Sequence, residues 1–257
     1  MRKHYALSLL GLIAVASAGC PASMVSSPSW EPYGYIKADM TTETNETLNL
    51  GAAAGTTQFH RVANNTNDGS VALSANDTRI GAKLDMGAIT GAIEADMWNA
   101  SVNLRHAFVR LDLDNDMYLV AGQTWDLFGM LNPDTLNYTV LWRTGNVGLR
   151  SPQVRWEWMP EYGMQVQVAF SAPRNTQEEL PDILGRFVFD LDSVMLAASV
   201  VMGNTMFGAA PAANQTVFGT AVEASAKLAD GLTIKGEWYA GTNLSTYMGG
   251  LIRTPNP

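Results

Sequence analysis

Apolar and polar residues alternate along most of the chain, in short runs separated by Gly, Asn, Asp and Pro. In one such run, Arg79, Lys83 and Asp85 share one parity, and apolar side chains take the other. Alternation of period two is typical of a strand with one polar and one apolar face, and helical periodicity is nearly absent. The pattern therefore predicts an all-β chain.

Eleven strands are predicted from these runs. They cover residues 33–40, 78–86, 88–98, 102–113, 117–125, 153–158, 164–172, 183–191, 193–202, 216–228 and 232–241. The run 102–113 is the least regular, because His106 and Arg110 share a parity while Arg105 takes the other. A β-bulge near Arg105 would restore the alternation.

The links between these strands alternate in length. Tight links fall at 87, 114–116, 159–163, 192 and 229–231, whereas most of the others are long: 41–77, 126–152, 173–182 and 203–215. Short turns at one end and long loops at the other are typical of outer-membrane barrels, with the short turns in the periplasm. We therefore predict an antiparallel transmembrane β-barrel.

A secreted β-sandwich is the main alternative, because its strands also alternate. Two features favour the barrel: the apolar faces carry mostly small and aliphatic residues, and the aromatic residues gather near strand ends. There they would form interfacial girdles of amphipathic rings. The aromatic residues concerned are Trp98, Tyr118, Trp125, Trp156, Trp158, Tyr162 and Trp238.

The N-terminus has the features of a secretory signal peptide, with Arg2 and Lys3 before a short apolar run and small residues at its end. We expect a signal peptide at 1–18, a short linker at 19–32 and a barrel domain at 33–257. Cys20, the only cysteine, is either a lipidated first residue or an inert thiol. No later stretch reaches the roughly 20 apolar residues of a transmembrane helix.

The charge balance argues against a nucleic-acid partner. The formal net charge is −8, and it becomes −10 when Arg2 and Lys3 are removed with the signal peptide.

Bacterial single-chain barrels have an even number of strands, and an eleventh strand would deliver the chain to the outside. We therefore expect an incomplete barrel, whose full form is larger and even-numbered.

In a pore, selectivity depends on charges at the narrowest point, and a loop folded inward often forms it. The long link 126–152 is the candidate, and it carries Arg143 and Arg150. Strand parity predicts further inward-facing residues, which are Lys37, Arg79, Lys83, Arg105, Gln123, Arg155 and Arg186. Alternatively, the basic residues pair across strands with carboxylates and add stability only; the candidate partners are Asp39, Asp85, Glu94, Asp96 and Glu157.

Catalytic and metal motifs are scarce. Beyond the signal peptide only His60 and His106 remain, and the chain has neither HExxH nor Gly-x-Ser-x-Gly. The alternation in 112–116 puts three Asp close together, but it lacks the Gly and the distal Glu of a calcium loop. We predict no enzyme activity, no cofactor and no metal site.

Several segments resemble the DcaP-like family of outer-membrane porins. They are GYIKADM (34–40), NDTRIGAKLD (76–85), LRHAFVRLD (104–112), LVAGQTWDLF (119–128) and GEWYAGTNLSTYMGG (236–250). The resemblance implies a homotrimeric barrel in the outer membrane of a Gram-negative cell, which passes small, preferentially anionic, dicarboxylate-like solutes by diffusion. Unlike that family, this chain has no long helical segment before the barrel and lacks its C-terminal strands.

The expected function is therefore an outer-membrane porin, with lipid around it and small anions as solutes. A plugged barrel with a structural or binding role and a secreted sandwich that binds a ligand are the alternatives.

Overall fold

The computed structural model describes residues 25–43, 47–49, 60–62, 70–98, 101–131, 147–160, 162–172, 180–207, 213–244 and 247. The predicted signal peptide and Cys20 lie outside these ranges. Within them, no helix is long and apolar enough to cross a membrane.

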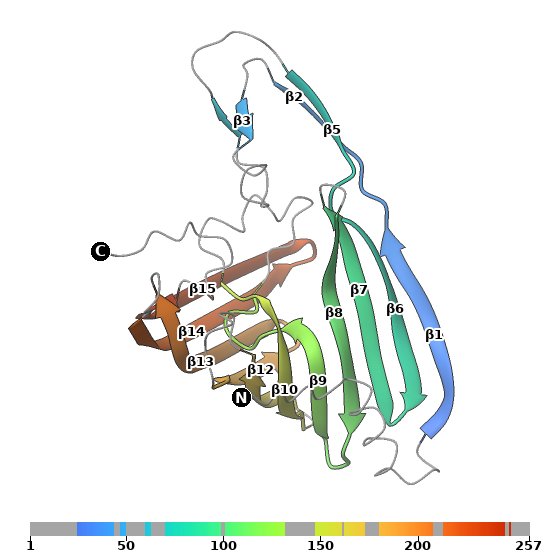
Figure 1. Cartoon of the computed structure of the whole chain (residues 1–257). Helices are drawn as coiled ribbons and strands as arrows, with labels where there is room; N and C mark the ends of the chain where they lie inside the picture. The colour runs from blue at the N-terminus through green and yellow to red at the C-terminus, as the bar shows by residue number, and fades with distance from the viewer. Residues whose placement is uncertain are drawn as a thin grey trace, which may run out of the picture.

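One large antiparallel sheet of eleven strands dominates the molecule (Figure 1). In spatial order its strands are β1 (Val25–Tyr35), β6 (Thr78–Gly87), β7 (Ile89–Trp98), β8 (Ser101–Asp112), β9 (Met117–Trp125), β10 (Arg150–Trp158), β11 (Met164–Ser171), β12 (Asp182–Leu191), β13 (Val194–Phe207), β14 (Ala213–Ala229) and β15 (Leu232–Thr242). Each of them pairs with its neighbours in this order. The prediction of an all-β, antiparallel chain is confirmed.

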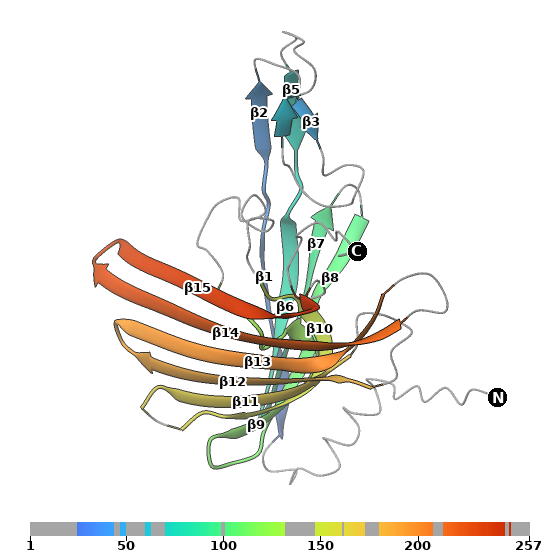
Figure 2. The same cartoon turned by 90° about the vertical axis from the view of Figure 1, so that its left-hand side faces the viewer.

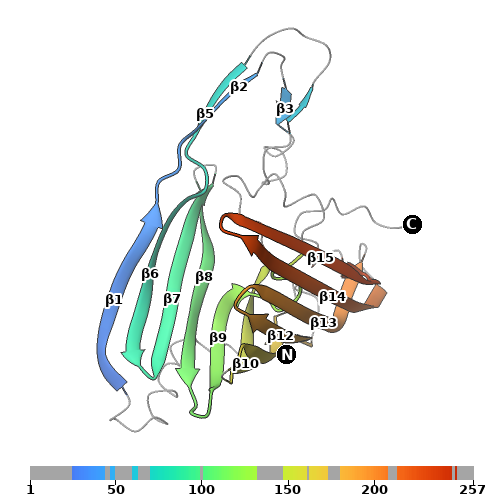
Figure 3. The same cartoon turned by 180° about the vertical axis from the view of Figure 1, so that it is seen from behind.

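The sheet curls so that β6–β8 and β12–β15 lie on opposite sides of a concavity, as Figures 1 and 3 show. In the described part of the chain β1 and β15 are the two edges and do not pair with each other, so the sheet is not closed. Eleven antiparallel strands alternate in direction, and the two edge strands therefore run the same way.

The first strand begins at Val25, well before the predicted start at residue 33, and its first eight residues fall in the predicted linker. Pro28 and Pro32 argue against a strand at this position in the sequence, because proline lacks the N–H that a central strand needs. An edge strand has one unpaired side, and β1 is an edge. The two prolines are therefore compatible with its pairing to β6.

Four short strands, the first beginning at Asp39 and the others within the predicted loop 41–77, form two small two-stranded antiparallel sheets. They are β2 (Asp39–Glu43) with β5 (Ser70–Ser74) and β3 (Thr47–Asn49) with β4 (His60–Val62). Figure 2 shows this extension beyond the end of the large sheet. Strands of three to five residues are too short to be recognised from alternation alone.

A β-bulge occurs at Arg105, as predicted. In the pairing of β7 with β8, His106 lies opposite Glu94 and Leu104 lies opposite Ala95, so Arg105 has no opposing residue. The extra residue shifts the parity of β8 at this point. His106, which is hydrogen-bonded to Thr124 at 3.0 Å, and Arg105 thereby come to the same face of the sheet.

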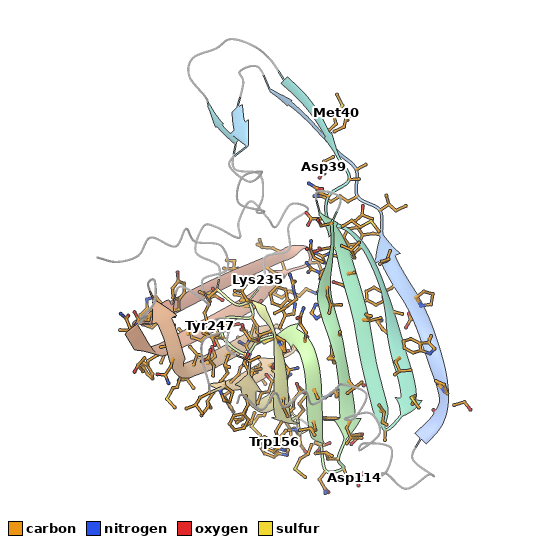
Figure 4. All side chains as sticks on the ribbon, in the orientation of Figure 1. Asp39, Met40, Asp114, Trp156, Lys235 and Tyr247 are labelled. Carbon is orange, nitrogen blue, oxygen red and sulfur yellow. The ribbon has the colours of Figure 1, made fainter. Side chains whose placement is uncertain are left out.

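The tight links lie at the end opposite the β2–β5 extension, as Asp114 and Asp39 illustrate in Figure 4. Asp114, Asn115 and Asp116 all have positive φ angles, and the Asp114 amide donates to Asp112 Oδ1 at 3.0 Å. Asn and Asp tolerate this left-handed backbone better than most residues. The Asp-rich run is therefore explained by the turn.

The two faces of the sheet differ sharply in polarity. The inner, concave face buries polar and charged side chains, among them Asp96, Arg105, Ser151, Gln153, Glu157, Gln167, Arg186 and Glu223. The outer, convex face exposes large apolar ones, among them Ile80, Ile93, Val154, Trp156, Phe170, Phe187, Leu196, Met202, Phe218 and Trp238. This arrangement is the reverse of a sandwich core and is typical of a transmembrane barrel wall.

Candidate pore wall and constriction loop

Arg105, displaced by the bulge, lies at the centre of a buried ion-pair cluster on the concave face. Its Nε lies 2.6 Å from Glu94 Oε1, and its Nη1 lies 2.8 Å from Asp96 Oδ2. Because only 4% of Arg105 is exposed, its charge depends on these two carboxylates rather than on water. The side-chain amide of Asn103 also donates to Asp96, at 3.2 Å.

Glu157 is the centre of a second cluster and is 2% exposed. Arg155 Nε lies 2.8 Å from Oε1 of Glu157, and Arg110 Nε lies 3.2 Å from Oε2. The Gln167 amide donates to the same carboxylate at 3.1 Å. The Arg110 guanidinium also lies 3.6 Å from the centre of the Tyr118 ring, within cation–π range. One buried carboxylate is thus paired with two arginine side chains.

Arg186 forms a bidentate pair with Glu223, with both guanidinium Nη atoms donating to the two carboxylate oxygens. The pair reaches from β12 to β14 across β13, where the small Ser199 lies opposite Arg186. Both partners are buried. Two parallel charge-assisted hydrogen bonds fix the orientation of the guanidinium as well as compensating its charge.

Lys37 lies just past the end of β1, outside the large sheet. Its Nζ is 2.8 Å from Asp39 Oδ2 and 3.4 Å from Asp77 Oδ2. Burial by itself lowers the pKa of Lys37, but the hydrogen bonds and negative charges of Asp39 and Asp77 exceed that effect and raise the pKa above its usual value. Lys37 therefore remains charged at neutral pH.

Arg79 and Lys83 line the concave face of β6. The Arg79 guanidinium lies 5.5 Å from the centre of the Tyr35 ring. Lys83 is the more exposed of the two: its side chain is 59% exposed, and its Nζ is 3.6 Å from the carboxylate of Glu31, whose side chain is 71% exposed. A pair of this kind in water contributes little to stability.

The inward orientation predicted for Gln123 is wrong. The register places Gln123 opposite Ala107 and Pro152, on the apolar side of β9, because its concave residues are Val120, Gly122 and Thr124. The Gln123 amide instead donates to the carbonyl of Leu104 at 2.8 Å, next to the bulge.

The two basic residues predicted for the loop differ in outcome. Arg150 is the first residue of β10 rather than part of the loop, and its guanidinium lies 4.5 Å from the centre of the Trp125 ring. Arg143 lies outside the described residues. Arg79, Lys83, Arg105, Arg155 and Arg186 do face the concavity, whereas Lys37 lies outside the large sheet. Arg105, Arg155 and Arg186 form ion pairs instead of an unopposed basic ladder.

The described ends of the link between β9 and β10 lie in the concavity. The side chain of Asp126 joins these two ends at the neck of the loop, where the chain leaves β9 and returns to β10. The Phe128 amide donates to Asp126 Oδ1 at 3.1 Å, and the Leu149 amide donates to Oδ2 at 3.2 Å. The Asp126 amide also donates to the Leu149 carbonyl at 2.8 Å. One buried side chain thereby holds the outgoing leg (126–131) and the returning leg (147–149) of this loop together.

Two carboxylates of the wall hold the legs against it. Glu223 of β14 accepts a hydrogen bond from the Met130 amide at 3.3 Å, and Glu237 of β15 accepts one from the Val147 amide at 3.4 Å. Glu223 and Glu237 lie directly opposite each other in the register. Each leg therefore has its own acceptor on the wall.

Apolar contacts complete the docking of the loop. Leu127, Phe128 and Val147 are at most 1% exposed, and they pack on small and aliphatic residues of the concave face and on two residues that follow β15. The other members of this cluster are Ala169, Leu184, Val201, Val217, Ala221, Leu244 and Tyr247. Figure 4 shows Tyr247 inside the curve of the sheet.

The opposite part of the concave face stays open. A hollow of about 650 Å³ lies over β1 and β6–β9. Charged and aromatic side chains line it, among them Glu31, Tyr33, Lys83, Asp85, Glu94, Phe108 and Arg110. The described legs of the loop thus pack on the β11–β15 side of the concave face, and the hollow lies on the β1–β9 side.

Four residues that hold the loop, directly or through Tyr247, are not predicted from the sequence: Asp182, Glu223, Glu237 and Tyr247. Glu223 and Glu237 share the polar parity of their strands, and that signal was available. Nothing in strand parity indicates that a carboxylate will receive a backbone amide from a distant loop. Such contacts arise only when the sheet curls.

Comparison with known proteins supports the fold and goes no further. No family model and no curated protein sequence match the chain. Among solved structures, the chain is similar to OmpT, an outer membrane protein of Vibrio cholerae, in a mutant form that lacks loop L8. The TM-score is 0.52 at 12% identity, over 85% of this chain and 72% of that one.

In vitro folded OmpT, in its trimer form, gives a TM-score of 0.51 at 11% identity, over 85% and 68% of the two chains. An anion-selective porin from Comamonas acidovorans covers 85% and 80% at 12% identity, but its TM-score of 0.47 is too low to carry an inference. The chain therefore has the fold of an outer-membrane β-barrel.

Proposed function

We propose that this chain forms the wall of an outer-membrane porin, through which small polar solutes diffuse passively. The observation that carries the proposal is the reversed polarity of the sheet: ion pairs such as Arg186–Glu223 are buried on the concave face, while Ile93 and Trp238 are exposed on the convex face. An apolar exterior is stable in contact with lipid, and charged side chains on the interior are stable in a water-filled lumen.

The constriction in this proposal is the loop between β9 and β10. Its legs are fixed to Glu223 and Glu237 on one half of the concave face, so solutes would pass over the open half. Passage of this kind requires lining charges and a fixed width, and no nucleophile or general base. The proposed activity is therefore transport without catalysis.

The finer proposal is a preference for small anions, and the resemblance to DcaP-like porins extends it to dicarboxylate-like compounds. Lys83 supports the preference as an exposed basic side chain of the open hollow, although the carboxylates of Glu31 and Asp85 line the same hollow. The pairing of Arg105, Arg155 and Arg186 with carboxylates limits its strength. An outer-membrane location in a Gram-negative cell and a trimeric assembly are parts of the same proposal.

Planar-bilayer recording of the purified protein tests the proposal. We expect stepwise currents, and a reversal potential in a KCl gradient that indicates a modest preference for chloride. In Lys83→Gln the reversal potential should shift towards zero. Cation preference in the unaltered protein would refute the finer proposal, and absence of any current would refute the porin itself.

A barrel plugged by its loop is a second candidate, which the buried cluster around Phe128 and Tyr247 favours. It predicts no current from the unaltered protein, yet heat-modifiable migration on a gel, which a barrel shows and a secreted sandwich does not.

A further inference from the structure

The chain turns back into the concavity immediately after β15. Asn243 has a φ of 57°, and its side-chain amide donates to the Thr216 carbonyl of β14 at 2.8 Å. The Tyr247 amide then donates to the Leu244 carbonyl at 2.8 Å, which closes a turn. This reversal directs Leu244 and Tyr247 towards the wall.

The wall leaves room for this segment at Gly219. A Cβ at Gly219 would lie 2.5 Å from Leu244 Cδ2 and 3.0 Å from Phe128 Cζ, so no larger residue fits without a shift. Leu244 and Tyr247 are 6% and 1% exposed. The segment after β15 and the constriction loop thus share one apolar cluster on the concave face.

Tyr247 connects the wall to both legs of the loop, through one contact with each of the three. Its hydroxyl donates to Asp182 Oδ2 on β12, and its carbonyl accepts from the Gly148 amide at 3.0 Å. Its ring meets the Phe128 ring edge to face, with centroids 5.7 Å apart. Buried Asp182 cannot move far, so it fixes the tyrosine relative to the sheet.

We infer that Tyr247 is a positioning residue for the constriction, and that Leu244 and Tyr247, which follow β15, form a second inward anchor of the pore. The inference rests on the proposed porin function and adds a residue outside the loop between β9 and β10. Loss of the Asp182 hydrogen bond should free the Gly148 leg and make the width of the passage fluctuate.

Tyr247→Phe tests this directly, because it keeps the ring and removes only the hydroxyl. Tyr162→Phe is the matched control, since Tyr162 is 84% exposed in a tight turn. In bilayer recordings Tyr247→Phe should at least double the open-channel current noise, whereas Tyr162→Phe should match the unaltered protein. Unchanged noise in Tyr247→Phe, with heat-modifiable migration intact, would overturn the inference.

Hydrogen exchange provides a readout that does not depend on conduction. In the full-length protein in lipid, the peptide containing Val147 and Gly148 should exchange about five- to tenfold faster in Tyr247→Phe, as expected for the loss of one hydrogen bond. Peptides from the tight turn at Tyr162 should exchange equally in both proteins. If the unaltered protein carries no current, the porin proposal fails, and the exchange rates still decide the role of Tyr247.

Discussion

Buried arginines on the concave face depend on nearby carboxylates for their charge, and Arg105 illustrates the consequence. Arg105→Gln would leave Glu94 and Asp96 close together and uncompensated. We expect a loss of about 3–5 kcal/mol in the free energy of unfolding, measured by denaturant titration in lipid vesicles. The control is Lys227→Gln, which removes an exposed partner of Asp230 and should change stability by less than about 0.5 kcal/mol. Equal losses would contradict the role of the buried cluster.

Gln123 gives a second prediction at the scale of one residue. Its amide satisfies the Leu104 carbonyl beside the bulge, so Gln123→Ala should cost about 1 kcal/mol in unfolding free energy. Because Gln123 belongs to the convex side, the reversal potential should not move, in contrast to Lys83→Gln. A shift in selectivity without a loss of stability would show that Gln123 lines the lumen after all.

At the scale of one element, the strand pairing of β8 with β9 depends on Gly122. Its φ is 125°, and an added Cβ would overlap the Ala107 carbonyl oxygen and lie 2.7 Å from Phe108 Cα. Gly122→Ala should therefore cost at least about 1–3 kcal/mol in the free energy of unfolding. Gly236→Ala on β15 is the control, since its Cβ would meet no atom within 4 Å. Similar stability of the two variants would argue against close approach of these strands.

The constriction loop is the second element with a testable anchor. Asp126 accepts from the Phe128 and Leu149 amides with different oxygens, and an asparagine has only one carbonyl oxygen. Asp126→Asn should destabilise the neck by about 1–3 kcal/mol and accelerate hydrogen exchange at these amides. Asp114→Asn, in an exposed turn, should leave exchange in the loop unchanged. Full protection of both the Phe128 and the Leu149 amides in Asp126→Asn would disprove the anchoring role.

For the molecule as a whole, reversed polarity is the property that separates a membrane barrel from a soluble sheet. Ile93 is 51% exposed on the convex face, and its neighbour Ala92 lines the concave hollow. In lipid, Ile93→Arg should cost about 2–4 kcal/mol in unfolding free energy, whereas Ala92→Arg should be tolerated. The opposite ranking would indicate a sandwich whose core is the apolar face.

Alternation of residues by itself determined the strands, their order and the polarity of their two faces. The physical reason is local: side chains of a strand point alternately to opposite faces, so charge on one parity and aliphatic residues on the other describe a wall. Even the bulge could be predicted, because Arg105 breaks the parity that His106 resumes. The first eight residues of β1 were not predicted, because their two prolines argue against a strand. The strands β2–β5 were not recognised as separate strands, since they are too short.

Only the tertiary structure decided which charges meet. Glu157 forms an ion pair with Arg110 of another strand. Glu237 accepts a hydrogen bond from the amide of a loop residue about ninety positions earlier, and Tyr247 donates one to Asp182. These contacts depend on the register of the strands and the curl of the sheet, which alternation leaves open. Lys and Arg at inward-facing positions therefore predicted a positively charged wall. In the folded sheet, carboxylates from neighbouring strands lie beside them and neutralise much of that positive charge.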